Sequence, residues 1–351
     1  MTNDERDQNV AMIRASTAAI TGGQGALKRI RELRFREPGF NRAVWSEICG
    51  LGWLGLRLDE AQGGAGLGMV ETCALLEELG AALVPEPIIP AMAAMPLLSD
   101  DLRERALEGS EMVLLAWQET LDAFPARPSA AWRSGKVSGT KIFVPSANGA
   151  DGFAITVDGG IALVRRNSPG LDVVSVGHVD GGFSATLRLD EVEAEFMPTD
   201  RVQDAIDMSA LATGAYLIGL AQAAHEATLS YLGTRQQFGR LIGSFQSLQH
   251  RAVDQAVQLA LCRASVRQAA ELWDAEAPLT ARQRAISRAK ARTSDTSLLV
   301  TRQAVQMHGG IGFTDEHDIG LYLRKAMSMA NSYGSSRLHR ARFGQLSMQA
   351  A

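Results

Sequence analysis

The chain has 351 residues, of which 46% are hydrophobic and 21% are charged, and this composition is that of a globular protein rather than of a disordered or collagen-like one. At about 100–200 residues per domain, the length predicts two or three domains. The net charge of −4 argues against a generally basic nucleic-acid binder. No stretch approaches the roughly 18 apolar residues of a membrane span, and the acidic, polar N-terminus is unlike a secretory signal, so we expect a cytoplasmic protein without a membrane partner.

Charge is unevenly distributed along the chain. Residues 235–342 contain 16 Lys and Arg against 8 Asp and Glu, a balance of +8, which leaves −12 for residues 1–234. Such an excess of basic side chains is typical of solvated helix faces, but it also suits an anionic ligand such as a nucleotide or a coenzyme phosphate.

Residues 1–110 are predicted to form a helical domain. Apolar residues follow one another at three- and four-residue steps, the stripe of an amphipathic helix, at Val70, Cys73, Leu76, Leu79 and Leu83. Gly80 interrupts this pattern near its end, and Pro85 and Pro87 mark a break.

Residues 111–202 are predicted to form a middle β-domain, because the apolar segments become short, partly β-branched and separated by turn residues. The expected strands include Lys141–Val144, Gly152–Val157, Ile161–Val164 and Ala185–Leu189. No helix-length pattern separates them, which favours an antiparallel domain over a doubly wound parallel sheet.

Residues 203–351 are predicted to form a helical bundle. Helical spacing of apolar residues is sustained over several turns from Leu248 to Trp273, and helices of this length usually belong to bundles. The expected fold class is therefore α+β: N-terminal helices, a middle antiparallel β-domain and a C-terminal bundle.

Several familiar site patterns are missing or incomplete. Gly63, Gly64, Gly66 and Gly68 do not have the spacing of a dinucleotide-binding loop, and no regular βαβ pattern follows them. The six histidines have no metal-site spacing, so no metal is expected. A serine hydrolase would need a G-x-S-x-G turn, which the chain lacks.

Two segments favour a nucleotide site: YLGTRQQFGRLIGSFQSLQH, at residues 231–250, and QMHGGIGF, at residues 306–313. Guanidinium groups bind phosphates in a forked geometry, an aromatic ring can stack on a base, and glycine lets a ligand approach the backbone closely. Solvated loops between bundle helices are the plainer interpretation of either segment alone.

These two segments resemble the signatures of the acyl-CoA dehydrogenases, as do WSEICGLGWLGLRLDEAQGGAGLGMVETCALLEELG and GTKIFVPSANGADGFAITV nearer the N-terminus. The resemblance covers about residues 42–345. It implies the same three-part fold and an FAD enzyme that desaturates an acyl-CoA between its α and β carbons. A carboxylate would remove the α proton, hydride would pass to the flavin, and an electron-transfer flavoprotein would be the redox partner.

The resemblance also implies which residues contact the cofactor. Arg235 would meet the FAD diphosphate and Phe238 would lie by the adenine end, while Gln306, Gly309 and Gly310 would line the same region. Ser335 is a further expected cofactor contact. These residues would serve the FAD of a second subunit, so the resemblance implies a homo- or hetero-oligomer.

The expected catalytic carboxylate is missing from both family positions. The turn Ser332–Ser335 matches the family's Tyr-Glu-Gly-Thr-like turn but has Tyr333 in place of Glu, and the alternative base position, thirteen residues before Gln222, holds Ser209. An ordinary phenol has a pKa of about 10 against about 4.3 for a Glu carboxyl, so Tyr is a poor substitute.

The expected flavin-ring contacts are also altered. The loop that touches flavin and substrate in the family is reduced to Trp117–Thr120, and the Trp-x-Thr segment behind the flavin reads Phe143–Ser146. There Pro145 replaces a Thr and lacks an amide donor.

The residues expected at the flavin ring and at the catalytic base are altered, whereas those expected at the adenosine diphosphate end are retained. Three hypotheses follow from this difference. The chain could be one subunit of a heteromeric acyl-CoA dehydrogenase, resembling the paired short subunits of steroid side-chain breakdown. It could instead be a homo-oligomeric dehydrogenase with a relocated base, for which the nearby carboxylates are Asp204, Asp207, Asp315 and Glu316. The third hypothesis is a flavin-dependent oxygenase or a non-catalytic interaction protein on the same fold.

Overall fold

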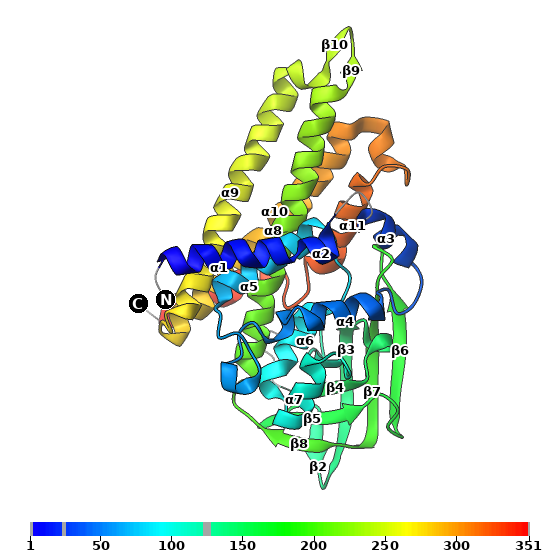
Figure 1. Ribbon diagram of the computed structural model, residues 1–351, viewed down its shortest axis with the longest axis vertical. Coiled ribbons are helices and arrows are strands. Elements are labelled where there is room, and N and C mark those ends of the chain that lie inside the picture. The colour runs from blue at the N-terminus through cyan, green and yellow to red at the C-terminus, as the bar shows by residue number, and fades with distance from the viewer. Residues whose placement is uncertain (1–2, 23–25, 122–127, 350–351) are drawn as a thin grey trace. The chain divides into compact units, whose positions relative to one another are not determined.

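The computed structural model describes residues 3–22, 26–121 and 128–349 of the chain. These residues form two compact units, each assembled from separate stretches of sequence. The first unit draws on residues 1–28, 73–84 and 210–351, and the second on residues 29–72 and 85–209. Helices come first along the chain, strands follow from Val113, and long helices return at Val202 (Figure 1). This order confirms the expected fold class.

The N-terminal helices are α1 (Asn3–Ser16), α2 (Ala18–Thr21), α3 (Ala26–Leu33), α4 (Arg42–Gly50), α5 (Met69–Ala81), α6 (Ile88–Ala94) and α7 (Asp100–Leu107). The apolar stripe predicted around Leu76 and Leu79 lies on α5, where both side chains are buried. Asn41 begins α4 as an N-cap, because its side-chain oxygen accepts a hydrogen bond from the amide of Ala43. Gly80 does not end α5, which continues to Ala81.

Among the described residues of the second unit, eight strands form two four-stranded sheets: β1 (Val113–Ala116), β2 (Ala131–Arg133), β3 (Lys136–Pro145), β4 (Gly152–Val157), β5 (Gly160–Arg165), β6 (Leu171–Gly177), β7 (Phe183–Glu193) and β8 (Glu195–Pro198). One sheet has the order β1-β4-β5-β8 and the other β2-β3-β7-β6. Neighbouring strands are antiparallel except β1 and β4, which pair in parallel. All four strands named from the sequence lie within β3, β4, β5 and β7.

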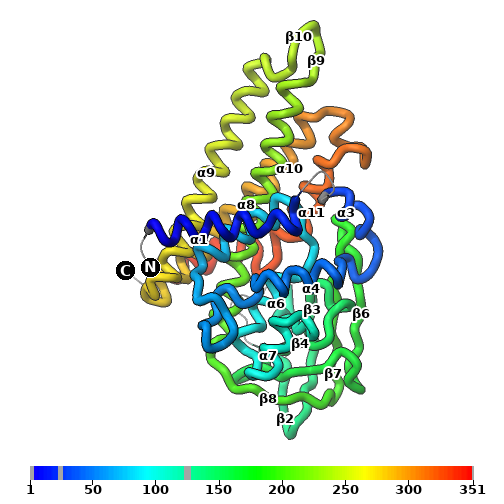
Figure 2. The backbone as a smooth tube through the Cα atoms, viewed as in Figure 1, coloured from blue at the N-terminus to red at the C-terminus, as the bar shows by residue number. Residues whose placement is uncertain are grey.

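The C-terminal helices are α8 (Val202–Thr234), α9 (Gln246–Asp274), α10 (Leu279–His308), α11 (Ile319–Met329) and α12 (Ser336–Gln349). A short hairpin of β9 (Gln236–Gln237) and β10 (Arg240–Leu241) joins α8 to α9 at the ends of these two helices (Figure 2). The bundle core includes Ala221, Leu259 and Val300, all buried. Within the described ranges, no helix combines the length and apolarity that a bilayer crossing needs.

Candidate functional site

Arg235 follows the last turn of α8, and two hydrogen bonds hold its backbone. The Arg235 amide donates to the carbonyl of Tyr231 at 2.9 Å, and the amide of Ile242 donates to the Arg235 carbonyl at the same distance. The side chain is exposed and makes no hydrogen bond or ion pair with the described residues. A fixed backbone with a free guanidinium is a suitable donor for an anionic ligand.

The β9–β10 hairpin presents Phe238 to solvent. Phe238 is 89% exposed and has a left-handed backbone with φ of 55°, and Gly239 follows at φ of 78°. Its ring meets Phe245 edge to face at 6.1 Å, while the guanidinium of Arg240 lies 4.0 Å from the centre of the Phe245 ring. A strained, exposed aromatic side chain is typical of a contact made with something outside the chain.

Gly309, Gly310 and Gly312, which follow α10, differ in whether the structure requires a glycine at their positions. Gly309 has φ of 67°, which favours glycine. Gly312 is needed for space, since a Cβ there would lie 2.6 Å from the Val305 carbonyl oxygen. Gly310 has neither requirement, because a Cβ there would meet nothing within 4 Å. Gly310 and Gln306 are exposed, and the Gln306 side chain forms no hydrogen bond with the described residues.

The structure brings these two segments together at one end of the bundle. Tyr231, one turn before Arg235, stacks on His308, the last residue of α10, with 4.4 Å between the ring centroids. The predicted residues Arg235, Phe238, Gln306, Gly309 and Gly310 therefore belong to one region of the first unit.

The turn between α11 and α12 carries Tyr333, which is buried and has a left-handed φ of 54°. Fully buried Lys290 donates from Nζ to the carbonyls of Ala330 at 2.8 Å and Gly334 at 3.1 Å. His339 Nε2 donates to the Tyr333 carbonyl at 2.8 Å. Burial lowers the pKa of Lys290 to about 7, despite the attraction of Asp295. Sequence reasoning missed this arrangement.

Ser335 lies at the start of α12, and its Oγ accepts a hydrogen bond from the amide of Leu338 at 3.3 Å. That contact is the one expected of a helix N-cap. Ser335 is half-buried, and its role as a cofactor contact stays a prediction.

The alternative base position offers no free acceptor for a proton. Ser209 is fully buried and its Oγ donates to the Ala205 carbonyl at 2.8 Å. Asp207, two residues away, is buried and accepts from Gln203 Nε2 at 3.2 Å. Asp315 forms an exposed ion pair with Arg324 at 2.8 Å.

Glu119, in the reduced loop of the second unit, is bound from several sides. Lys141, fully buried in β3, donates to Glu119 at 2.5 Å and to the Thr156 carbonyl at 2.6 Å. The backbone amides of Ser129 and Ala130 also donate to the Glu119 carboxylate. Glu119 is thus engaged in holding the loop. A lysine inside a strand pattern, in GTKIFVP, was the available sign of this ion pair.

Phe143 lies at an irregular position of β3, where the pairing with β7 shifts between Lys141 and Val144. It is 48% exposed and has φ of 55°. Pro145 ends the strand and pairs with Ser184.

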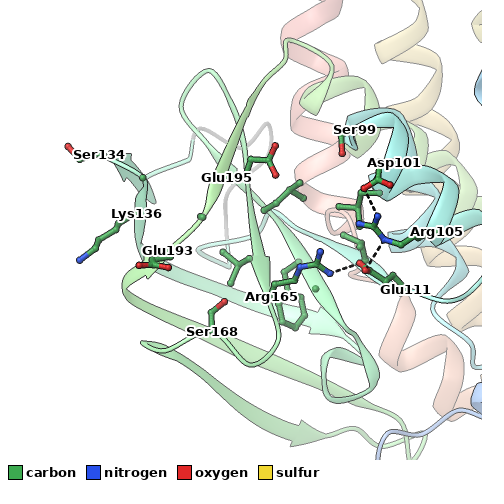
Figure 3. Close-up of a pocket in the computed structure, with 18 residues that line it drawn as sticks. Ser99, Asp101, Arg105, Glu111, Ser134, Lys136, Arg165, Ser168, Glu193 and Glu195 are labelled. Atoms are coloured by element: carbon green, nitrogen blue, oxygen red, sulfur yellow. Dashed lines mark hydrogen bonds and ion pairs between the residues drawn. The ribbon is translucent and has the colours of Figure 1, made fainter.

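A separate hollow of about 700 Å³ lies in the second unit between α7 and the strands (Figure 3). Four of its charged residues bind one another: Glu111 pairs with Arg105 at 2.9 Å and with Arg165 at 2.6 Å, and Arg105 also binds Asp101. This hollow contains none of the site residues predicted from the sequence.

Comparison with known proteins gives consistent matches over most of the chain. The acyl-CoA dehydrogenase N-terminal domain profile matches residues 8–105, and the acyl-CoA dehydrogenase C-terminal domain profile matches residues 199–346. The acyl-CoA dehydrogenase IpdE2 of Mycolicibacterium smegmatis is 30% identical over 332 residues, which cover 93% of this chain and 94% of the relative.

Two solved structures have the same fold over nearly the full length. A Tcur3481-Tcur3483 steroid ACAD variant has a TM-score of 0.90 at 28% identity and covers 98% of this chain and 99% of its own. The ChsE4-ChsE5 complex from Mycobacterium tuberculosis has a TM-score of 0.83 at 24% identity, with coverage of 99% and 98%.

Proposed function

The chain belongs to the acyl-CoA dehydrogenase family of oxidoreductases, and from that premise we propose that it is one subunit of an FAD-dependent acyl-CoA dehydrogenase whose catalytic carboxylate lies on a partner chain. The observation that carries this proposal is the contrast between two half-sites. At one, the Arg235 and Gln306 side chains are exposed and form no hydrogen bond with any residue that the structure describes. At the other, both base positions hold buried residues that are not carboxylates, Tyr333 and Ser209.

The residues present fit the diphosphate end of FAD. Arg235 supplies a guanidinium that no described carboxylate neutralises, and such groups bind phosphate oxygens through paired N–H donors. Gly310 leaves open space above its backbone, so a ligand can approach it closely. Phe238 offers an exposed ring for the adenine end. The exposed amide of Gln306 completes a set of donors suited to a nucleotide.

The fit is poorer at the flavin-ring end. Glu119 is held by buried Lys141 and by two backbone amides, and Pro145 has no N–H to donate. Bound FAD would accept the hydride removed from the β carbon of the acyl-CoA. Removal of the α proton requires a base within hydrogen-bond reach of it, and this chain presents no carboxylate at either family position.

Two-chain relatives support a heteromeric assembly. The 28%-identical solved structure is that of a steroid acyl-CoA dehydrogenase made of two proteins, Tcur3481 and Tcur3483. By this likeness, the substrate class proposed here is a CoA thioester of a steroid or another bulky acyl group. An electron-transfer flavoprotein is the proposed electron acceptor, as for the family.

An anaerobic visible spectrum tests the proposal. The full chain is purified alone, supplied with FAD, and titrated with butyryl-, octanoyl-, palmitoyl- and steroid-carboxyl-CoA. We expect no bleaching of the flavin band with any of them. When the chain is assembled with a family member that carries the catalytic Glu, we expect bleaching that Arg235→Ala in this chain weakens by reducing FAD retention.

A matched control is Arg267→Ala, which removes an exposed arginine of α9 that pairs with Glu271. Arg267 lies 21 residues into a helix that rises about 1.5 Å per residue, far from the hairpin. It should leave FAD retention unchanged. Bleaching of the chain alone would contradict the proposal and favour a homo-oligomer with a relocated base, for which buried Asp207 is the first residue to substitute.

A further inference from the structure

Three aromatic side chains join the end of α8 to the segment that follows α10. Tyr231 stacks on His308 with 4.4 Å between centroids and 20° between ring planes. His317, in the loop before α11, lies 4.6 Å from His308 and 6.2 Å from Tyr231. Aromatic rings at such separations attract one another. Tyr231, His308 and His317 are called the ring cluster below.

The ring cluster is connected directly to both nucleotide-site segments. The Tyr231 carbonyl accepts the Arg235 amide at 2.9 Å, so the ring and the arginine share one helical turn. On the other side, the Gly309 amide closes α10 by donating to the Gln306 carbonyl, next to His308. Any shift of Tyr231 against His308 would therefore move Arg235 relative to Gln306.

Both imidazoles are fixed by hydrogen bonds to the backbone. His308 Nδ1 donates to the Ala304 carbonyl at 2.7 Å, and His317 Nδ1 accepts from the Ile319 amide at 3.1 Å. Burial lowers the pKa of His308, and although the bond to Ala304 opposes this effect, His317 adds to it. A neutral ring stacks on Tyr231 without the cost of burying a charge.

His308 contributes to the ring cluster through its planar ring rather than through Nε2. The ring is 3% exposed, and its Nε2 has no hydrogen-bond partner among the described residues. Because stacking on Tyr231 needs only an aromatic ring, a phenyl ring at position 308 should serve it equally well.

We propose that the ring cluster holds Arg235 and Gln306 at the spacing that one adenosine diphosphate moiety requires, with Tyr231 and His308 as positioning residues. The ligand is the FAD of the proposed function, on which this step rests. Neither ring needs to touch the ligand, because each acts through the motif residue beside it. Binding through several donors at once depends on their mutual placement, and a small displacement is costly.

Affinity for ADP and FAD, measured by isothermal titration on the full chain in its purified assembly, tests this assignment. We expect Tyr231→Ala and His308→Ala each to weaken ADP binding about tenfold, whereas Tyr231→Phe and His308→Phe, which keep a ring, stay within about threefold of the wild type. In an Arg235→Ala background, Tyr231→Ala should add little, since no arginine remains to be positioned.

Val300→Ala is the matched control, because Val300 is a buried residue of the bundle core on the same helix as His308. Equal loss of ADP affinity in Val300→Ala, or full additivity of Tyr231→Ala with Arg235→Ala, would overturn the assignment in favour of general stabilisation. If Arg235→Ala itself leaves ADP affinity unchanged, the proposed function fails. If Arg235→Ala weakens binding while both alanine ring variants bind normally, only the ring cluster assignment fails.

Discussion

The buried amine of Lys290 should make the stability of the chain depend on pH. Its Nζ is fully buried and bonded to Ser294 Oγ and two backbone carbonyls, and no carboxylate bonds to it among the described residues. The nearby charges are Asp295, which attracts it and is itself paired with Arg340, and His339, whose pKa burial and Lys290 lower to about 3. Burying an uncompensated ammonium favours its neutral form.

Stability should therefore rise with pH above neutrality. The pKa of Lys290 is about 7 in the folded chain and about 10.4 in an unfolded one, so between these values the unfolded chain binds more protons. The free energy of unfolding then increases by up to about 1.4 kcal/mol per pH unit. Lys290→Met should flatten this slope, as measured by urea unfolding at fixed protein concentration between about pH 7 and 9.

Lys136→Met is the control for that slope, because Lys136 is exposed. Its one ion pair in the described chain is a loose surface contact, with 3.7 Å between Lys136 Nζ and a carboxylate oxygen of Glu191. The Lys136→Met variant should leave the pH dependence as in the wild type. A Lys290→Met variant with an unchanged slope would show that Lys290 is charged in the folded chain at pH 8.

At the scale of elements, two glycines allow α5 and α8 to cross closely. A Cβ on Gly80 would lie 2.0 Å from the Tyr216 carbonyl oxygen, and one on Gly219 would lie 1.8 Å from the Glu77 carbonyl oxygen. The sequence pattern marked Gly80 only as an interruption of a helix. A glycine is needed at position 80 because α8, more than a hundred residues further along the chain, packs against it. Local periodicity does not reveal such a contact.

Gly219→Ala should therefore destabilise the chain although alanine is the better helix former. The helix propensity of alanine would add up to about 1 kcal/mol, but forcing the two backbones apart should cost about 2–4 kcal/mol or more. Gly233, also on α8, is exposed with open space around it, so Gly233→Ala should be neutral or slightly stabilising. Thermal unfolding of both variants decides this, and a Gly219→Ala variant as stable as the wild type would disprove the close crossing.

At the scale of the whole molecule, local patterns predicted the element order and the strands well, since period and turn residues act over a few positions. Arg235 and Gln306 could be named as candidates for the same reason, because each belongs to a short signature, and their role stays a prediction. Contacts between distant residues were missed: Lys141 with Glu119, and Lys290 with the turn that carries Tyr333. Such contacts depend on which elements pack against each other, and a single sequence does not reveal that.

The division of the chain illustrates the same limit. The expected boundaries at about residues 110 and 202 stay a prediction, whereas the two compact units each combine separate segments, and residues 73–84 belong with residues 210–351. Within that unit the hydroxyl of Tyr216 donates to the Val84 carbonyl at 3.0 Å, and Glu77 lies 3.6 Å from Arg263. The bundle therefore includes a helix that the sequence assigned to the N-terminal part.

A fragment of residues 203–351 should accordingly not fold as the bundle does in the full chain. It lacks α5, whose Leu75, Leu76 and Leu79 are buried, and it would expose the close-packed face of α8 around Gly219. Exposure of that apolar surface removes the cooperative core, so we expect no sharp thermal transition by circular dichroism and strong binding of a hydrophobic dye. Mixing with a fragment of residues 1–84 should restore part of the transition. Cooperative unfolding of fragment 203–351 alone, within a few degrees of the full chain, would show that the bundle is independent of α5.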